Sequence, residues 1–415
     1  MNVGGASGPR PYEAELAWLY SLQRFGIKLG LENAHRLLKE LHIDLGERRV
    51  IHVAGTNGKG SVCAMIDSIA RAGGHRSGLF TSPHLVSFRE RVRVNGEMIS
   101  EESVAQGLRC LRERVAHWDP HPTFFELATA LALQHFSDKQ CDVIVLETGL
   151  GGRLDATNAV PSRVSVITPI GLDHQQWLGQ TVREIAGEKA GIIKSNVPVV
   201  SAQQPREAEE VLRAHAVACD APLTFVETSY TESPVALRGA HQKTNAAVAI
   251  AALRAAGLEV AAPAIARGLA AVEWPARFQR WDERTIIDGA HNPAAVRVLA
   301  ETWQEIFGEQ RATVILAVLS DKDVAGIWQV LEPISDFVFL PKIRSARALP
   351  PHDLAQTLSA ISPQLPYSIT PSIAEAVEKA RERSGPTLIT GSLHFAGEVL
   401  AHLRGDPAAF EECAQ

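Results

Sequence analysis

The sequence feature that most constrains the fold is a glycine-rich segment between a strand-like run and a helix-like run. Residues 50–54 are mostly apolar, residues 55–61 read Gly-Thr-Asn-Gly-Lys-Gly-Ser, and residues 62–69 have the apolar spacing of a helix. Glycines let several backbone N–H groups point into one concavity, and the helix that follows adds the positive end of its dipole. The segment therefore predicts a phosphate-binding loop in which Lys59 binds the outer phosphates of a nucleotide.

The spacing of this loop departs from the usual phosphate-loop pattern. Only two residues separate Gly55 from Gly58, Gly60 stands where a Mg²⁺-binding hydroxyl is expected, and Ser61 follows one step later. An ordinary strand-to-helix turn is the alternative interpretation. The Gly-Lys-Gly-Ser string between a strand and a helix favours a nucleoside triphosphate site.

Length, charge and cysteine content limit the kinds of protein in which such a loop can occur. At 415 residues the chain is longer than one hydrophobic core usually supports, so we expect two domains. The net charge of −6 gives no general attraction to nucleic acid. The five cysteines are scattered without a C-x-x-C pair, which is typical of a reducing compartment with neither disulfides nor a zinc site.

No segment has the composition of a membrane span or of a signal peptide. Charged residues interrupt the Ala-rich stretch 246–272, and residues 1–10 lack an apolar core. We therefore expect a cytoplasmic protein with no membrane or nucleic-acid partner.

Strand-like and helix-like segments alternate along the whole chain, which predicts an α/β fold. We expect a doubly wound parallel-sheet N-terminal domain with the phosphate loop (residues 1–283) and a smaller Rossmann-like α/β C-terminal domain (residues 284–415). The expected helices of the first domain include 11–24, 31–42, 101–117, 124–138, 181–193 and 205–218, and the expected strands of the second are 284–288, 312–318, 336–340, 366–370 and 386–390.

A β-hairpin is expected at Asn95-Gly96, a dipeptide that favours tight turns between strands. Arg89, Arg91 and Arg93 alternate with other residues just before this turn. We expect them on a solvated strand face, with phosphate binding as the alternative.

Two polar residues at or after strand ends are candidate metal ligands. Glu147 ends the apolar run 141–146 and is followed by glycines, which suits a carboxylate that holds a hard cation beside a nucleotide. His174 lies in the loop after the next strand. Capping of a turn by Glu147 and a structural role for His174 are the alternatives.

Lys189 lies on the apolar stripe of its helix. The stripe reads Val182, Ile185, Ala186, Lys189 and Ile193, which is the spacing of a buried helix face. A buried ammonium is costly unless it is paired, neutralised or modified. The side chain could extend to solvent or pair with a carboxylate; alternatively, its neutral amine could take up CO₂ to form a carbamate that faces Mg²⁺.

Several strings together resemble folylpolyglutamate synthase, including its bifunctional dihydrofolate synthase form. The resemblance covers residues 12–400 and rests on the strings at 55–61, 81–85, 89–91, 147–158, 172–174, 188–192 and 288–293. The variant phosphate loop is the form that this family shares with the cell-wall Mur ligases.

The resemblance implies an ATP-dependent ligase that acts on dihydropteroate and reduced folates. ATP phosphorylates a substrate carboxylate, and the amino group of L-glutamate then displaces phosphate from the acyl phosphate to form an amide. Such chemistry depends on positioning and charge neutralisation more than on a protein nucleophile. The resemblance further implies Mg²⁺, with two ions expected, and K⁺ is a further candidate. We expect a monomer.

The resemblance also assigns roles to individual residues. It places Lys59, Lys189 and His291 in the catalytic set. The nucleotide site comprises Thr56, Asn57, Gly58, Lys59, Gly60, Ser61, Asn245, Arg277 and Asp288. The metal ligands are Ser82, Glu147, His174 and a carbamylated Lys189. The substrate sites are His291 and Ser392 for glutamate, and Ile27, Lys28, Leu29, Gly30, Thr123 and Asp155 for the pterin.

Some of these assignments have structural alternatives. Asn245 and Ser392 could be helix caps, and Phe124 and Phe125 could be core residues instead of pterin-stacking ones. Three functions stay open beside the bifunctional enzyme, which Thr123 and residues 27–30 favour. They are a folylpolyglutamate synthase alone, a Mur-like ligase acting on another substrate, and a nucleotide-dependent switch that ligates nothing.

Overall fold

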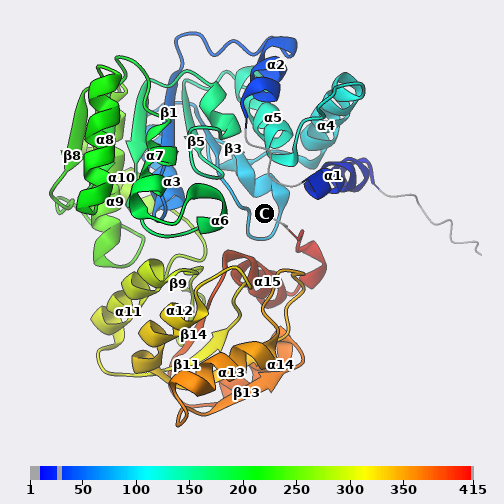
Figure 1. Cartoon of the computed structure of the whole chain (residues 1–415), viewed down its shortest axis with the longest axis vertical. Helices are drawn as coiled ribbons and strands as arrows, with labels where there is room; N and C mark the ends of the chain where they lie inside the picture. Colours follow the sequence, from blue (N-terminus) through cyan, green and yellow to red (C-terminus); the bar gives the residue numbers. More distant parts are fainter. Residues whose placement is uncertain (1–9, 26–29, 413–415) are drawn as a thin grey trace, which may run out of the picture.

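The computed structural model describes residues 10–25 and 30–412, which form two lobes stacked along the long axis of the molecule (Figure 1). The first lobe is built on an eight-stranded sheet with the strand order β4-β3-β2-β5-β1-β6-β7-β8. The strands β2, β5, β1, β6, β7 and β8 are parallel to one another. At one edge of the sheet, β3 pairs antiparallel with β2, and β4 pairs antiparallel with β3. The strands are β1 (Arg49–Ala54), β2 (Ser77–Phe80), β3 (Val92–Val94), β4 (Glu97–Met98), β5 (Val143–Glu147), β6 (Val164–Ile167), β7 (Val199–Ala202) and β8 (Leu223–Val226).

Helices cover both faces of this sheet because alternate residues of each buried strand point to opposite sides. Ile51 and Val53 pack in one cluster with α3, α9 and α10, whereas Val50 packs in another with α1, α4 and α5. Ala54 joins a third cluster with α7 and α8. The helices are α1 (Pro11–Ser21), η1 (Leu22–Phe25), α2 (Glu32–Glu40), α3 (Lys59–Ala72), η2 (Phe88–Arg91), α4 (Glu101–Val115), α5 (Phe124–Asp138), η3 (Ala156–Ala159), α6 (Gln175–Leu178), α7 (Val182–Ala190), α8 (Arg206–Ala218), α9 (Ala240–Ala255) and α10 (Ala262–Ala271).

The second lobe is built on a six-stranded sheet with the order β13-β12-β11-β14-β10-β9, parallel except for β9. The helices α11, α12 and α13 cover one face of this sheet, and α14 and α15 cover the other. The strands are β9 (Gln279–Arg280), β10 (Thr285–Ile287), β11 (Ala312–Leu316), β12 (Ser335–Pro341), β13 (Tyr367–Thr370) and β14 (Thr387–Thr390). The helices are α11 (Pro293–Phe307), α12 (Val324–Leu331), η4 (Glu332–Ile334), α13 (Pro351–Ile361), α14 (Ile373–Glu382), α15 (Leu393–Leu403) and η5 (Pro407–Ala409). The expected fold class of two α/β units is confirmed.

The second sheet begins earlier in the chain than the sequence suggests. Strand β9 lies before residue 284 and pairs antiparallel with β10. We therefore propose that the boundary between the two units lies before β9 instead of at residue 283.

The expected hairpin is present, but of the three arginines before it only Arg93 lies on a strand, where it is partly exposed. The strands β3 and β4 flank Asn95-Gly96, whereas Arg89 and Arg91 belong to the short helix η2. Arg91 is fully buried, and its Nε donates to Nδ1 of His84 at 2.8 Å. The expectation of a solvated face was wrong for Arg91, because its guanidinium lies against His84 and over the rings of Phe88 and Phe124.

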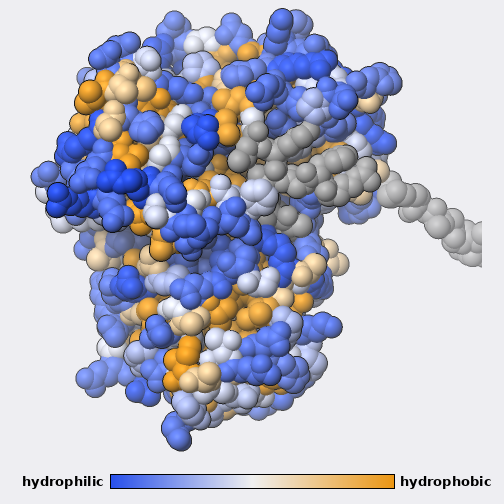
Figure 2. Space-filling model, viewed as in Figure 1, coloured by the Kyte–Doolittle hydropathy of each residue, from blue (hydrophilic) through white to orange (hydrophobic). Residues whose placement is uncertain are grey.

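The exterior is mixed in character. Figure 2 shows a face that is mainly hydrophilic, with hydrophobic residues in small groups between polar ones. Among the helices described here, none is long and apolar enough to cross a membrane.

One polar side chain within the first sheet has a pKa far from its ordinary value. His52 in β1 is buried, and its Nε2 lies 2.7 Å from Oγ1 of Thr157, which in turn donates to Asp155. Burial lowers the pKa of His52 to about 3. Between about pH 6.5 and pH 3 the unfolded chain therefore binds a proton that the folded chain does not.

This difference predicts that His52 weakens the fold in acid. The free energy of unfolding should fall as the pH drops below about 6.5, by up to about 1.4 kcal/mol per pH unit from this residue. His52→Gln, which keeps a donor to Thr157, should lose less stability than the wild type between pH 7 and pH 5, as measured by urea denaturation. The exposed His117→Gln serves as the control. Equal pH slopes for the wild type and His52→Gln would contradict this account.

Candidate active site between the lobes

A cavity of about 540 Å³ lies between the two lobes. The first lobe contributes the phosphate loop and the segments that follow β2, β5 and β6. The second lobe contributes the segment after β10 and the first turns of α11 and α15. The contributing strands thus present their carboxyl ends, where ligands of open α/β sheets bind.

The phosphate loop has the backbone conformation that its glycines predict. Gly55 has a φ of +151°, and a Cβ at this position would lie 1.9 Å from Oγ1 of Thr168. Gly58 has a φ of +86° and directly precedes α3, which begins at Lys59 instead of after Ser61. Residues 59–61 therefore form the first helical turn, whose N–H groups have no partner within the helix and suit an anion.

Hydrogen bonds fix the tip of the loop from both lobes. The backbone N–H groups of Thr56 and Asn57 donate to the carbonyl of Pro169 at 3.0 and 3.2 Å, and Thr56 Oγ1 donates to Gly171 O at 3.0 Å. From the second lobe, the amide of Asn292 exchanges hydrogen bonds of 3.1 and 3.3 Å with the amide of Asn57. The loop is therefore held in place by contacts on both sides of the cavity.

Glu147 is a buried carboxylate directly beside the phosphate loop. It ends β5 and lies opposite Val53 in the pairing of β5 with β1. Its Oε2 accepts a hydrogen bond from the backbone N–H of Ser82 at 3.1 Å. Burial raises the pKa of Glu147, although the charge of Lys59 acts in the opposite direction. A carboxylate in such a position would be stabilised in its charged form by a bound cation.

His174 has an unusual backbone conformation at the start of α6. Its φ is +51°, in the left-handed region, and its N–H donates to Oδ1 of Asp173 at 2.9 Å. Burial lowers the pKa of His174 to about 4. The imidazole is therefore neutral near pH 7, which is the form that binds metal ions.

The proposed metal ligands Ser82, Glu147 and His174 all line the cavity. Within residues 10–25 and 30–412, no group of three or more His, Cys, Asp and Glu side chains is close enough to hold a metal ion. This arrangement suits Mg²⁺ bound with a nucleotide, because such ions use one or two carboxylates and complete their shell with phosphate oxygens and water. The residues therefore fit a nucleotide-bound divalent ion better than a metal cage made of protein alone.

Lys189 is buried in the cavity wall, as its place on the apolar stripe predicts. Its Nζ donates to the carbonyl of Gly55 at 2.8 Å, and in the described part of the chain no carboxylate lies within 4.0 Å of it. Burial lowers the pKa of Lys189 to about 7, and the charge of Lys59 acts in the same direction. Neither alternative from the sequence, exposure to solvent or an ion pair, describes this side chain.

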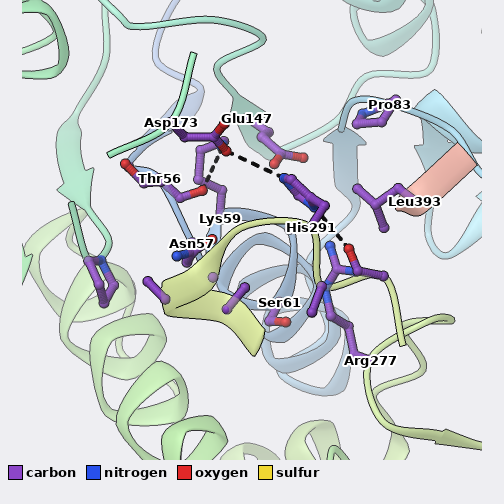
Figure 3. A pocket seen from close by; sticks show the side chains of 18 of the residues that line it. Thr56, Asn57, Lys59, Ser61, Pro83, Glu147, Asp173, Arg277, His291 and Leu393 are labelled. Atoms are coloured by element: carbon purple, nitrogen blue, oxygen red, sulfur yellow. Dashed lines mark hydrogen bonds and ion pairs between the residues drawn. The ribbon is translucent and has the colours of Figure 1, made fainter. Parts of the chain in front are cut away.

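A polar network joins the two lobes across the cavity (Figure 3). Asp173 of the first lobe lies 3.4 Å from Nε2 of His291 and accepts from Lys322 Nζ at 2.7 Å and from Asn292 Nδ2 at 3.1 Å. Burial alone would raise the pKa of Asp173. The hydrogen bond from His291 and the charges of His291, His174 and Lys322 instead hold that pKa below its ordinary value. The network keeps a negative charge at the junction of the lobes.

Three members of this network were not singled out from the sequence as site residues. Asp173 and Asn292 are each next to a proposed site residue, so adjacency could have indicated them. Lys322 lies in the string Asp321-Lys322-Asp323, which is typical of an exposed loop. No local pattern shows that its side chain is only 7% exposed and paired across the lobes.

Arg277 and Asp288 lie where the chain enters the second lobe. The linker has a contorted backbone, with φ values of +56° at Ala276 and +45° at Phe278. Asp288 supports this turn because its carboxylate accepts from the N–H groups of Phe278 at 2.7 Å and Ala290 at 2.8 Å. Burial lowers the pKa of Arg277, against the charges of Asp288 and Glu147. Both proposed nucleotide-binding residues line the cavity.

Asn245 is not a helix cap. It lies in the second turn of α9, is buried, and donates to Gln242 Oε1 at 3.0 Å. Its amide faces the phosphate loop, since a Cβ on Gly58 would lie 3.1 Å from Asn245 Oδ1. Position and contacts both place it in the wall of the cavity.

The proposed glutamate-binding residues line the cavity from the second lobe. Ser392 is the N-cap of α15, where its Oγ accepts from the N–H of Phe395 at 3.0 Å. His291 donates through Nδ1 to the carbonyl of Gly289 at 2.9 Å, so its Nε2 is the atom that faces Asp173. The alternative role of Ser392 as a cap is thus confirmed, and the cap lies at the cavity.

The proposed pterin-binding residues are not brought together at this cavity. Ile27, Lys28 and Leu29 lie outside the described residues. Among the residues that the structure describes, Gly30, Thr123 and Asp155 do not line the cavity.

Thr123 and Asp155 instead support the local backbone. Thr123 is the N-cap of α5. Asp155 accepts from the N–H groups of Gly149 at 2.8 Å and Leu150 at 2.9 Å, which do line the cavity. Phe124 is a core residue stacked on Tyr20 at 5.6 Å, as its alternative interpretation held.

Two family models match this chain, and together they cover most of both lobes. The Mur ligase middle domain matches residues 53–253, and the Mur ligase glutamate ligase domain matches residues 276–393. The fold and the site therefore define an ATP-dependent ligase of the Mur ligase class.

Comparison with individual proteins identifies the family within this class. The Bacillus subtilis dihydrofolate synthase/folylpolyglutamate synthase is 34% identical over 95% of this chain and 99% of its own length. The solved structure of Escherichia coli FolC in complex with DHPP and ADP has a TM-score of 0.85 and 33% identity, covering 96% of this chain and 99% of that one. The Yersinia pestis bifunctional folylpolyglutamate synthase/dihydrofolate synthase, complexed with AMPPNP and a Mn ion, has a TM-score of 0.85 and 32% identity, covering 96% and 100%. This chain belongs to the dihydrofolate synthase/folylpolyglutamate synthase family.

The geometry of the phosphate loop predicts the effect of adding one methyl group. Gly55→Ala should weaken ADP binding by at least about tenfold, because the forced backbone conformation costs on the order of 1–3 kcal/mol and the Cβ meets Thr168. Isothermal titration calorimetry measures the affinity. Gly257→Ala is the control, since its φ of +73° is also positive but no atom lies within 4 Å of the added Cβ. An unchanged affinity of Gly55→Ala for ADP would contradict this role of the loop.

Proposed function

We propose that this chain adds L-glutamate both to dihydropteroate and to reduced folate (poly)glutamates, as a bifunctional dihydrofolate synthase/folylpolyglutamate synthase. The observation that carries the proposal is the cavity, in which Lys59 and Glu147 of one lobe face Arg277 and His291 of the other. A ligase must hold the phosphoryl donor, the acceptor carboxylate and the incoming amine together. A folylpolyglutamate synthase without the first activity is the second candidate.

The side chains divide the work between the two lobes. The first turn of α3 and Lys59 bind the phosphates of ATP, and Arg277 and Asp288 hold the nucleotide from the second lobe. Positive charge around the phosphates favours transfer of the terminal phosphoryl group to the acceptor carboxylate. His291 and Ser392 hold glutamate so that its amino group attacks the acyl phosphate and releases phosphate.

Divalent ions complete the nucleotide site in this proposal. Ser82, Glu147 and His174 would hold Mg²⁺, which supplies neutralisation of phosphate charge when bound. We propose two such ions, with K⁺ as a further candidate. The enzyme works as a monomer in this proposal.

The carbamate on Lys189 is part of the same proposal. A pKa of about 7 leaves a large fraction of neutral amine at pH 7, and only a neutral amine adds CO₂. The product is a carboxylate on the side chain, formed with release of one proton. It would place a negative charge beside the carbonyl of Gly55 and toward the proposed metal site.

The two activities differ in the acceptor molecule that they use. In this proposal the part of the cavity wall that belongs to the first lobe therefore contributes to specificity for the acceptor. Asp155 holds the N–H groups of Gly149 and Leu150, and a Cβ on Gly149 would lie 2.5 Å from the ring of Phe125. These contacts place Asp155 and the start of α5 directly behind the cavity wall. In this proposal the pterin of dihydropteroate binds beside this part of the wall.

One pair of assays tests the function. We expect glutamate-dependent release of phosphate from ATP with dihydropteroate and, separately, with a tetrahydrofolate monoglutamate. Activity with the tetrahydrofolate alone would indicate the second candidate, a folylpolyglutamate synthase without the activity on dihydropteroate. Phosphate release only with a UDP-muramyl acceptor, or with no acceptor, would contradict the folate function.

Lys189→Ala tests the carbamate. The variant should lose at least about 100-fold in kcat, because a metal-facing charge worth several kcal/mol is removed. Addition of a short carboxylic acid should restore part of the activity, since the acid can occupy the space of the missing carbamate. Lys194→Ala, a lysine whose Nζ donates to Asn158 O, is the control for loss of a nearby amine. Failure of acetate and propionate to rescue a folded Lys189→Ala would count against the carbamate.

A further inference from the structure

The last described residues of the chain return from the second lobe to the first. In Figure 1 the segment after α15 lies at the junction of the lobes, on the opposite side from the linker that leads into β9. We call residues 404–412 the C-terminal strap. Arg344 Nη1 donates to Pro407 O at 3.0 Å, which fastens the start of the strap to the second lobe. Further along the strap, Phe410 packs on His394 of α15, and the next residue, Glu411, contacts the first lobe.

Glu411 makes four hydrogen bonds to the first lobe. Its carboxylate accepts from Tyr12 Oη at 2.8 Å and from the N–H of Phe88 at 2.5 Å. Its own N–H donates to Val86 O at 2.8 Å, and its carbonyl lies 2.9 Å from His84 Nε2. Even a half-buried carboxylate is costly without donors, and here Tyr12 Oη and the N–H of Phe88 in the other lobe donate to it.

The tautomer of His84 follows from its neighbours. Arg91 Nε can only donate, so His84 Nδ1 is the acceptor in their 2.8 Å hydrogen bond. The hydrogen of the neutral ring is therefore on Nε2, which donates to the carbonyl of Glu411. Burial and the charge of Arg91 lower the pKa of His84, so this arrangement persists across neutral pH.

The strap contacts one particular loop of the first lobe, residues 82–88, which follows β2 and borders the cavity. Within this loop the N–H groups of Leu85, Val86 and Ser87 all donate to Glu90 of the same lobe. Phe88 is different, because its N–H donates across the junction to Glu411. One carboxylate from each lobe thus holds the backbone of this loop.

Helix α15 presses on the same loop from the second lobe. A Cβ on Gly397 would lie 1.9 Å from the carbonyl oxygen of Leu85, so the two backbones are in close contact. Val86 is 6% exposed and is buried in the hydrophobic cluster of the second lobe, together with Phe395 and Phe410. The loop is therefore in contact with both α15 and the strap.

We propose that Glu411 is a positioning residue of the active site, which holds the loop 82–88 against the second lobe and so keeps the cleft closed before substrates bind. The kinetic part of this proposal rests on the proposed ligase function. A cleft that is already closed binds its ligands without a loss of affinity for closing it. If only a fraction of the molecules is closed, the apparent dissociation constant rises by the inverse of that fraction.

The proposal predicts a specific split between kinetic parameters. Glu411→Ala should raise the KM for the folate acceptor and the KM for ATP by a similar factor, about five- to tenfold, while kcat stays within about twofold. The saturated complex is closed in both proteins, so turnover itself is unaffected. Glu411→Gln should largely keep the wild-type values, because its amide oxygen accepts from Phe88 and its amide nitrogen can donate to Tyr12 Oη. The matched control is Glu412→Ala at the next, exposed residue.

Gly397→Ala tests the same contact without changing Glu411. The added Cβ must push the backbone of Leu85 away, which also lowers stability, so the KM values and not the thermal midpoint are the readout for this variant. The KM values should rise as in Glu411→Ala. A lowered thermal midpoint with unchanged KM in Glu411→Ala, or wild-type KM values in Gly397→Ala, would show that the strap is only structural and would overturn the proposal.

Small-angle X-ray scattering tests the closed cleft without any activity. Ligand-free Glu411→Ala and Gly397→Ala should have a larger radius of gyration than the wild type, and Glu412→Ala should not. Hydrogen exchange at the amide of Phe88 should become faster in Glu411→Ala. Unchanged scattering and exchange in both variants would overturn the proposal. Should the wild type ligate glutamate to no folate acceptor, the function of the preceding section fails, and scattering and exchange still decide the role of the strap.

Discussion

Both lobes bury charged side chains at their common boundary, and the cost of that burial constrains the rest of the structure. Around one cavity, Glu147 and Lys189 are buried, the side chains of Asp173 and Lys322 are mostly covered, and Arg277 and Asp288 are half-buried. Each such charge is expensive unless hydrogen bonds or opposite charges compensate it. The compensation comes mostly from the other side of the cavity or from loop backbone, so the site and the contact between the lobes are the same set of interactions.

The parallel sheets explain why these charges can be brought together at all. Apolar strands covered on both faces end at one edge, and the side chains after them meet there although they are far apart in sequence. The pairing of β1 with β5 puts Glu147 next to the phosphate loop. The pairing of β1 with β6 puts Thr168 and Pro169 under that loop, where only a glycine fits at position 55.

Sequence patterns predicted those parts of the site that are encoded within one lobe. The glycine spacing gave the loop, the apolar run gave the strand that ends in Glu147, and the helical stripe marked Lys189 as buried. Each of these signals is local, because it comes from the period of a strand or helix or from the backbone freedom of glycine. The resemblance to a known family then supplied roles that periodicity does not contain.

Contacts between the lobes left no comparable signal. Lys322 belongs to a charged string that reads as an exposed loop, and Arg91 precedes a hairpin that reads as a solvated one. Lys322 is paired with Asp173 of the other lobe, whereas Arg91 packs on Phe124, which lies further along the chain in its own lobe. Glu411 also could not be found, since a single glutamate near the end of the described chain has no pattern that reveals a partner almost four hundred residues away.

The insertion of Val86 into the cluster of the second lobe has a consequence for how the protein is made. The apolar interior of the second lobe includes a side chain that is synthesised some two hundred residues before that lobe begins. Because domains emerge from the ribosome in chain order, the first lobe can present Val86 as a finished surface on which the second lobe assembles. The two lobes are then coupled in folding, and a fragment made of the second lobe alone would have a gap in its interior where Val86 belongs.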